Sequence, residues 1–239
     1  MDVVGNYNLL FDQSKGVFNT MLDKVGPKSL VTSHNYLLDY DKLMVAINDR
    51  PEAAVLEVAV KEYQFALYAL CSGQYRYAFG GLRLFFELML SVVQFSAHEI
   101  DFHLWSKDKK DINWTALKNQ DNGIFSNNFI RAFNPDLAGS GKQYAAIAES
   151  VYRECSEFIH GNALTHQNLP NDISFHEEAF SEWHKKSSIM RLAIIFAFSS
   201  RYLNHIDRQK MIIIEPVIMD VLGHLQPIQN AFSKSHEEL

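Results

Sequence analysis

The stretch "YRYAFGGLRLFFELMLSVVQFSA", residues 75–97, decides the fold. Apolar side chains occupy most of its positions, and a helix that is apolar on nearly all sides is normally buried by other helices. The stretch contains Arg83 and Glu87, and the other apolar runs of the chain fall well short of the ~20 residues that a membrane-spanning helix needs. We therefore expect the central helix of a soluble, all-α bundle and no membrane partner.

A second bundle helix is expected just before it, in "NDRPEAAVLEVAVKEYQFALYALCSGQ", residues 48–74. Apolar residues recur there at near-helical spacing. Asp49 is expected to cap this helix, with Pro51 in its first turn and Ser72-Gly73 at its end.

A third helix is expected in "SGKQYAAIAESVYRECSEFIHG", residues 140–161. Ser140 with Gln143 three residues later has the spacing of a capping box, and Gly161 suits the end of the helix. A phosphate-binding loop over the same residues is the weaker interpretation, because no strand precedes them and Gln143 replaces the required Ser or Thr.

The C-terminal part is expected to hold a long helix over residues 175–205 and a segment over 206–232 that is broken near Pro216. "MIIIEPVI", residues 211–218, is the one β-like run, and a strand there remains an alternative. "HEEAFSEWH", residues 176–184, lacks the spacing of a zinc-binding HExxH helix, so we interpret it as a solvated helix start.

The domain organisation is expected to be an N-terminal extension over residues 1–50, packed on a helical bundle over residues 51–239. Asn-Gly, Asn-Pro and Gly-Ser-Gly sequences break the pattern over residues 98–139, which we interpret as a helical excursion between two bundle helices. Its aromatic residues are expected to form a small satellite core, with a base-stacking surface as the alternative: Trp105, Trp114 and Phe125.

Composition and charge narrow the classes of function. Hydrophobic residues make up 47% and charged residues 21%, as in ordinary soluble globular proteins. The net charge is −6, with 22 basic against 28 acidic side chains and no Lys/Arg block, which argues against a general nucleic-acid binder. Any nucleic acid is expected to be held locally or after assembly with another subunit. Cys71 and Cys155 are interpreted as reduced thiols of a cytoplasmic protein.

Arg153 and His160 are the strongest candidates for chemistry. They are seven residues apart, so on a helix they project from nearly the same face, about 10 Å apart along the axis, with Ser156 and Glu157 between them. Arginine holds phosphate oxygens in a fork, and histidine moves a proton at neutral pH. The alternative is structural, because a cationic histidine at a helix C-terminus also complements the helix dipole.

The stretch "YRECSEFIHGN", residues 152–162, resembles the HEPN superfamily. These are helical-bundle domains of prokaryotic toxins, of abortive-infection and other anti-phage proteins, and of CRISPR-associated ribonucleases. Their motif is an arginine, a polar residue and then a histidine on a late bundle helix, and here it reads as Arg153, Glu154 and His160. The resemblance covers about residues 51–205.

The resemblance implies an endoribonuclease that needs no metal or cofactor and acts as a homodimer, with two Arg/His pairs meeting in one cleft. Arg153 would grip the phosphate of the RNA, and His160 would act as acid or base or orient the 2′-OH, with Glu154 beside them. It also implies a toxin or anti-phage effector, with an antitoxin or a protein of a defence complex as partner. The alternative is a non-catalytic helical module that mediates dimerisation or partner binding.

The central helix carries charged residues that match the arginine-and-glutamate pattern of the same superfamily. Arg83 and Glu87 are four residues apart, and Arg76 precedes Arg83 by two turns. They are expected either to form an internal ion pair that fixes helix register or to orient the side chains of Arg153 and His160. Gly80 and Gly81 are expected to let another helix approach closely.

Overall fold

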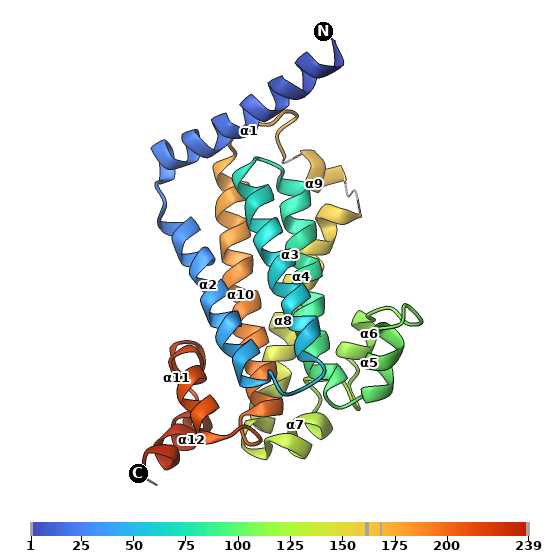
Figure 1. Ribbon diagram of the computed structural model, residues 1–239, viewed down its shortest axis with the longest axis vertical. Helices are drawn as coiled ribbons and strands as arrows, with labels where there is room; N and C mark the ends of the chain where they lie inside the picture. The colour runs from blue at the N-terminus through green and yellow to red at the C-terminus, as the bar shows by residue number, and fades with distance from the viewer. Residues whose placement is uncertain (1, 161–162, 168, 238–239) are drawn as a thin grey trace.

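The computed structural model describes residues 2–160, 163–167 and 169–237, and every regular element in these ranges is a helix (Figure 1). The expected all-α class is therefore confirmed. In chain order the elements are α1 (Val3–Val25), α2 (Lys28–Ala46), α3 (Ala53–Cys71), α4 (Tyr75–Phe95), α5 (Glu99–Trp105), α6 (Trp114–Leu117), α7 (Asn127–Phe133), the 3₁₀ helix η1 (Pro135–Ser140), α8 (Gly141–Ile159), α9 (Ala163–Gln167), α10 (Glu177–Tyr202), α11 (Arg208–Leu222) and α12 (Gln226–Glu237).

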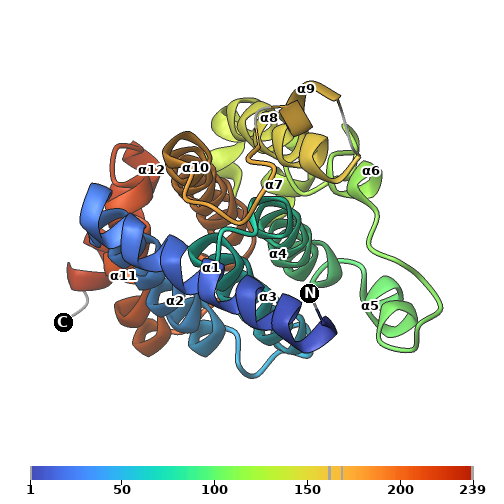
Figure 2. The same ribbon diagram turned by 90° about the horizontal axis from the view of Figure 1, so that it is seen from above.

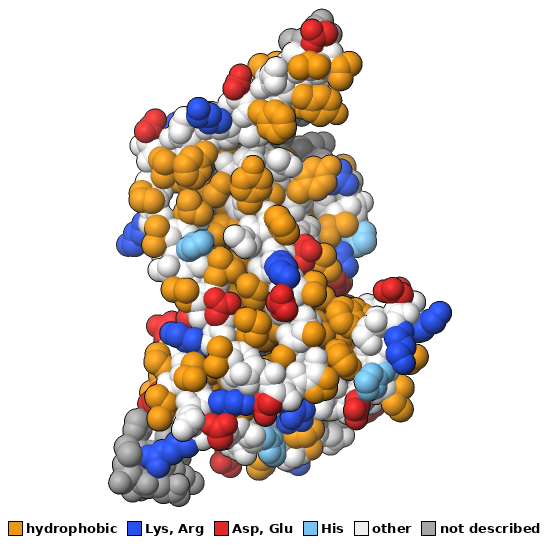
Figure 3. Space-filling view, in the orientation of Figure 1, with side chains coloured by type: hydrophobic (Ala, Val, Ile, Leu, Met, Phe, Trp, Pro, Cys, Tyr) orange, Lys and Arg blue, Asp and Glu red, His pale blue; other side chains and the backbone are white. Residues whose placement is uncertain are grey.

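The first fifty residues form two helices with different surroundings. α2 lies along the bundle and packs against α3, α10 and α11. α1 crosses one end of the bundle, and its N-terminal half extends beyond it (Figures 1 and 2). Val17 and Met21 are the buried residues of α1, so many of its hydrophobic side chains stay on the surface (Figure 3). Gly26, with φ +68°, supplies the left-handed backbone that ends α1.

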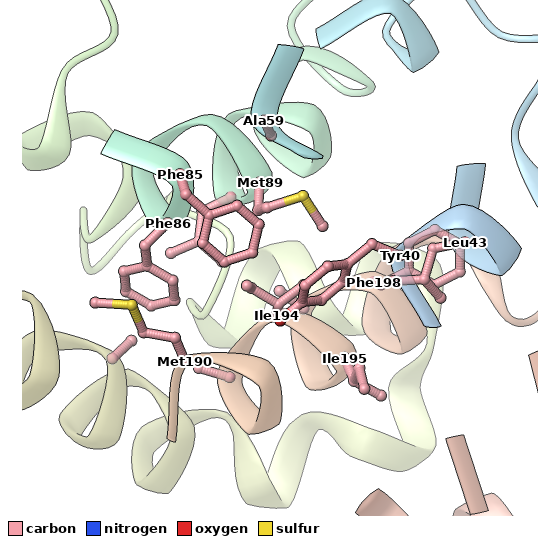
Figure 4. Close-up of a cluster of buried hydrophobic side chains, with 14 of the residues drawn as sticks. Tyr40, Leu43, Ala59, Phe85, Phe86, Met89, Met190, Ile194, Ile195 and Phe198 are labelled. Carbon is pink, nitrogen blue, oxygen red and sulfur yellow. The ribbon is translucent and has the colours of Figure 1, made fainter. Parts of the chain in front are cut away.

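α4 is the centre of the bundle, as its sequence predicts. It packs against α3, α8 and α10. Between Phe85 and Phe95 every side chain except that of Glu87 is buried. Phe85 meets Tyr40 of α2, with ring centroids 5.1 Å apart, in the core that Figure 4 shows between α4, α2 and α10. Burial on all sides of the C-terminal half of α4 explains why that half has no polar face.

α4 is also the one described helix that is long and apolar enough to span a membrane by length and composition. However, 72% of its apolar window is buried inside the bundle. This combination is typical of the core helix of a soluble protein.

One glycine sets the distance between α3 and α4. A Cβ atom added at Gly81 would lie 3.0 Å from the Cβ of Ala66 on α3. At Gly80 the added atom would meet Ile159 of α8 at an ordinary contact distance of 3.7 Å. The expected close approach of another helix is therefore made by α3, at Gly81.

The excursion over residues 98–139 consists of α5, α6, α7 and η1, joined by turns. The ring of Trp114 stacks on Tyr152 of α8, with centroids 3.7 Å apart. Phe125 is buried beside Phe196 of α10, and Trp105 is partly buried against the same cluster. The core interpretation of these aromatic residues is confirmed, but their core is continuous with that of the bundle.

The start of α10 is more deeply packed than its charged sequence suggests. The N-cap His176 accepts a hydrogen bond of 3.2 Å at Nδ1 from the Ala179 N–H. Phe180 and His184 are buried, so the expectation of a solvated helix start is wrong. The reason is that α10 packs against α2, α4 and α8 together. On the α2 side, Nδ1 of His184 lies 2.6 Å from Oγ of Ser33.

Residues 211–218 are helical, so the strand alternative is wrong, and the expected break near Pro216 is wrong as well. α11 continues through Pro216 and ends at Leu222. A proline inside a helix removes the N–H bond to the carbonyl four residues earlier. That carbonyl belongs to Ile212, which is 59% exposed, so water can replace the missing bond.

Asp49 does not cap α3, and Ser140 occupies the N-cap position of α8 without forming the predicted capping box. α3 begins at Ala53 rather than next to Asp49, whose carboxylate instead accepts a 2.5 Å hydrogen bond from Lys210. α8 does follow Ser140, but that side chain makes no capping bond. An N-cap side chain reaches the helix from an extended backbone, whereas η1 leads directly into α8 and holds Ser140 at φ −96°, ψ −13°.

Candidate functional site

Arg153 and His160 lie on the face of α8 that points away from the bundle. Cys155 is buried against the core, and at about 100° per residue Arg153 projects about 160° away from it. His160 is the C-cap of α8, and its N–H donates a 3.1 Å hydrogen bond to the Ser156 carbonyl. Both Arg153 and His160 are exposed. Gly161, which was predicted to end this helix, lies outside the described residues.

The side chains of Arg153 and His160 are available to a ligand. Within the described ranges, neither side chain has an ion pair or a hydrogen bond. An exposed guanidinium without a carboxylate partner keeps all five N–H donors for solvent or for an anion. The outward face of α8 therefore presents an unengaged cation and an unengaged imidazole two helical turns apart.

Arg76 adds a second guanidinium at the same end of α8. It projects from the first turn of α4, and its Nη2 lies 3.5 Å from the carbonyl oxygen of Ile159, next to His160. A cation at the C-terminus of a helix is favoured by the exposed carbonyl groups there. The antiparallel packing of α4 and α8 thus places Arg76 close to His160, although 84 residues separate them in the sequence.

Arg83 and Glu87 form the expected ion pair, at 3.2 Å, and both bind Tyr152 of α8. Nη2 of Arg83 donates a 2.6 Å hydrogen bond to the Tyr152 hydroxyl, and that hydroxyl donates a 2.7 Å bond to Glu87. Burial and the bond to Glu87 raise the pKa of Tyr152 to about 12. The phenol therefore stays protonated and keeps donating at neutral pH, which fixes α4 against α8.

Glu154 projects about 100° around α8 from Arg153 and faces α10. It forms an ion pair with Lys186 of α10 and accepts a 2.8 Å hydrogen bond from Ser150. Lys186 also pairs with Glu182, at 2.8 Å, and its side chain is only 5% exposed. Partial burial acts to raise the pKa of Glu154, but the bonds from Lys186 and Ser150 outweigh burial and lower it. Glu154 is thus held as an ionised carboxylate.

Glu154 and Glu157 line a groove of about 690 Å³ between α8 and the start of α10. Phe79 and Phe158, stacked with centroids 3.8 Å apart, form an apolar part of its wall. Four glutamates face Lys186 and His176 there, so the groove is acidic: Glu154, Glu157, Glu178 and Glu182. Among the described residues that line it, neither Arg153 nor His160 appears. The groove therefore adjoins the outward face of α8 at Glu157 but does not include Arg153 or His160.

Some predicted residues have structural partners, and two residues of the site were not predicted. Oγ of Ser156 donates a 2.8 Å bond to the Tyr152 carbonyl within α8. Lys186 and Tyr152 were missed by the sequence analysis. The spacing of Glu182 and Lys186 suits an intrahelical ion pair, but nothing in the sequence indicates their partner on α8.

In the described part of the chain no three His, Cys, Asp or Glu side chains are placed to hold a metal ion.

The chain was compared with family models, with curated proteins and with solved structures. No family model, no curated protein and no solved structure matches it.

Proposed function

We propose that this protein is a HEPN-like, metal-independent endoribonuclease of the cytoplasm, acting as a homodimer, with Arg153 and His160 as its catalytic residues. The observation that carries the proposal is the outward face of α8, where both side chains are exposed and, among the described residues, unpaired. On a helix face that a second copy of the chain can meet, such an arginine and histidine can address one phosphodiester and its 2′-hydroxyl across the interface.

The reaction is an attack of the RNA 2′-OH on the adjacent phosphorus. Imidazole takes the 2′ proton, the new P–O bond forms, and the bond to the 5′ oxygen of the next nucleotide breaks. The imidazolium formed in this way returns the proton to that leaving oxygen, directly or through a water molecule. Arginine binds the non-bridging oxygens and stabilises the charge that develops on them. The products are a 2′,3′-cyclic phosphate and a 5′-hydroxyl.

A second copy of the chain completes each phosphate site. Seven residues of helix separate Arg153 from His160 by about 10 Å along α8, which is more than one phosphate group spans. Two α8 helices packed antiparallel across a twofold axis bring Arg153 of one chain beside the partner's His160. Each of the two phosphate sites then consists of an arginine from one chain and a histidine from the other.

The surrounding residues position this pair. Arg83 and Glu87 hold α8 through Tyr152, and Glu154 holds its other side through Lys186. Arg76 binds the last carbonyl of α8 and adds positive charge beside His160. Ser156 and Glu157 lie between the two catalytic residues along α8, with Glu157 turned toward the acidic groove.

The test is cleavage of total RNA or tRNA by purified protein in EDTA. Wild type should give fragments that end in a cyclic phosphate, and His160→Ala and Arg153→Ala should abolish them while keeping the thermal melt. His103→Ala, at an exposed histidine on α5, is the matched control and should cleave normally. Equal cleavage by wild type and His160→Ala would refute the proposal.

Mixing the two inactive variants tests the dimeric site. A heterodimer of Arg153→Ala and His160→Ala chains contains one intact Arg/His pair and one pair without either residue. Mixing should therefore restore part of the activity that each variant lacks alone. No recovery, despite subunit exchange, would place the arginine and histidine of a site on the same chain.

As a toxin-like effector, the wild type should arrest the growth of a host that expresses it, whereas His160→Ala should not. Arrest by both proteins would separate toxicity from cleavage and contradict the proposed role in defence.

A non-catalytic role in dimerisation or partner binding is the second candidate. A groove of about 500 Å³ lies between α1 and α3, with Phe11 and Phe18 on one side and Leu67 and Tyr68 on the other. Phe11 is 72% and Tyr68 is 70% exposed, and Phe65 is 66% exposed on the same helix as Tyr68. Large exposed hydrophobic areas of this kind mark interaction sites.

The second candidate predicts that neither the wild type nor His160→Ala cleaves RNA. Phe11→Asp and Tyr68→Asp should then convert an assembled protein to a monomer in light scattering. Ile100→Asp, at a residue 76% exposed on α5, is the matched control. An unchanged mass in Phe11→Asp and Tyr68→Asp would exclude the groove between α1 and α3 as the interface.

A further inference from the structure

We propose that a basic groove at the start of α8 binds the phosphate backbone of single-stranded RNA and leads the strand to Arg153 and His160. This inference rests on the proposed function and adds a substrate-binding region to it. The groove has a volume of about 700 Å³ and lies between the chain around α6 and α7 and the first turn of α8. We define the basic groove by its cations, Lys118, Arg131 and Lys142.

The charge of this groove is opposite to that of the whole chain. The protein has a net charge of −6, yet three cations and one carboxylate, Glu149, line the basic groove. Lys118 neutralises Glu149 through a 2.7 Å ion pair. Arg131 and Lys142 are exposed, and no residue in the described ranges forms an ion pair with either of them. Two cations therefore remain free to bind phosphate.

The acidic groove, at the C-terminal end of α8 beside the face that carries Arg153 and His160, is a useful contrast. It has nearly the same volume, about 690 Å³, but four glutamates line it and its lysine is already paired with two of them. A polyanion is repelled there and attracted to the basic groove. Of these two grooves, the basic groove is thus the one with unpaired cations that can hold phosphates ahead of Arg153.

The basic groove and the catalytic residues lie on one line along α8. Lys142, Glu149, Arg153 and His160 follow one another at intervals of seven, four and seven residues. On a helix with about 100° per residue, these positions fall within about 40° of one another. Lys142 and Arg153 are eleven residues apart, which is about 16 Å along the axis. At 3.4 Å or more per nucleotide, about five nucleotides at most connect the two positions.

Side-chain amides in the basic groove favour a single strand over a duplex. Asn119, Gln120 and Asn127 line it beside the cations. Oδ1 of Asn119 accepts backbone N–H bonds of 2.9 and 3.1 Å from Asp121 and Asn122, which orients its NH₂ group without using it. Amide groups bind base edges that are accessible in unpaired RNA and hidden in an A-form duplex.

The test is RNA binding in the His160→Ala background, so that cleavage does not interfere. Fluorescence anisotropy is measured with a labelled twelve-nucleotide single strand at several salt concentrations. Adding Arg131→Gln and Lys142→Gln should weaken binding about tenfold and reduce the salt slope by about 1.4, since each phosphate contact on a single strand contributes about 0.7. The matched control carries Lys107→Gln and Lys109→Gln, two exposed lysines after α5, and should bind like its parent.

Two outcomes would overturn the inference: unchanged affinity in the Arg131/Lys142 variant, or an equal loss in the Lys107/Lys109 control. Equal affinity of the parent for an RNA duplex of the same length would also overturn the single-strand assignment. These results are distinct from failure of the proposed function. RNA binding that depends on Arg131 and Lys142, without any cleavage by the wild type, would refute the nuclease while leaving the basic groove as an RNA site.

Discussion

The guanidinium of Arg83 on α4 donates a 2.6 Å hydrogen bond to the hydroxyl of Tyr152 on α8, the residue directly before Arg153. Glu87 accepts from the same hydroxyl, and the ring of Tyr152 stacks on Trp114 of the excursion. Three segments distant in sequence therefore meet at one tyrosine. This contact fixes the rotation of α8 and so the direction in which its outward face points.

Tyr152→Phe should reduce both stability and activity. The change removes the hydroxyl that bridges Arg83 and Glu87 and leaves their own 3.2 Å pair. We expect the free energy of unfolding to fall by about 1–2 kcal/mol and RNA cleavage to fall while the far-UV spectrum stays unchanged. Tyr77→Phe, at a tyrosine 73% exposed on the same helix as Arg83, is the control. Unaltered stability in Tyr152→Phe would show that the bridge is not needed.

Gly81→Ala and Gly80→Ala should have opposite effects on stability. The new methyl group at position 81 would lie 3.0 Å from the Cβ of Ala66, forcing α3 and α4 apart, and should lower the free energy of unfolding by about 1–3 kcal/mol. At position 80 it meets Ile159 at 3.7 Å, and the gain in helix propensity should stabilise the protein by up to about 1 kcal/mol. Urea denaturation measures both. A destabilised Gly80→Ala variant would contradict this packing.

Glu154→Gln and Glu182→Gln should be strongly non-additive. Each single change leaves Lys186 with one carboxylate and should cost about 1 kcal/mol or less. The double change leaves a lysine whose side chain is 5% exposed without a counter-charge, and should cost about 3 kcal/mol. Adding Lys186→Met to the double variant should restore most of the loss, because the buried charge is gone. Additive losses in a double-mutant cycle would disprove the coupling.

His184 should make stability fall as the pH decreases from neutral. Burial lowers the pKa of His184 from 6.5 to about 4. Below pH 6.5 the unfolded chain binds a proton that the folded protein does not, so the free energy of unfolding decreases. The expected contribution is about 1 kcal/mol between pH 7.5 and 5.5.

Chemical denaturation at each pH, compared between wild type and His184→Gln, isolates this contribution. The difference in the free energy of unfolding between wild type and His184→Gln should change by about 1 kcal/mol between pH 7.5 and 5.5. His103→Gln, at an exposed histidine, should parallel the wild type. If the stability of His184→Gln and that of the wild type change in parallel with pH, then His184 is protonated as readily in the folded protein as in the unfolded chain.

The local pattern of the chain was enough to predict the class of fold and its central element. α4 is apolar on nearly every side, and such a helix is buried whichever helices surround it. The pair Arg83–Glu87 was predictable for the same reason, because residues four apart on a helix meet without help from the rest of the chain. The end of α3 at Ser72-Gly73 was also predicted correctly. The predicted capping box at Ser140 and the predicted break at Pro216 failed, because neighbouring segments determine the backbone there.

The sequence by itself determined that Arg153 and His160 share one face of a helix, since a spacing of seven residues returns to nearly the same direction. The tertiary structure decided which way that face points, because burial of Cys155 and the bridge through Tyr152 turn it to solvent. It also decided that Glu154 pairs with Lys186, 32 residues further along the chain. Contacts between helices depend on how whole faces pack, and no local spacing encodes them.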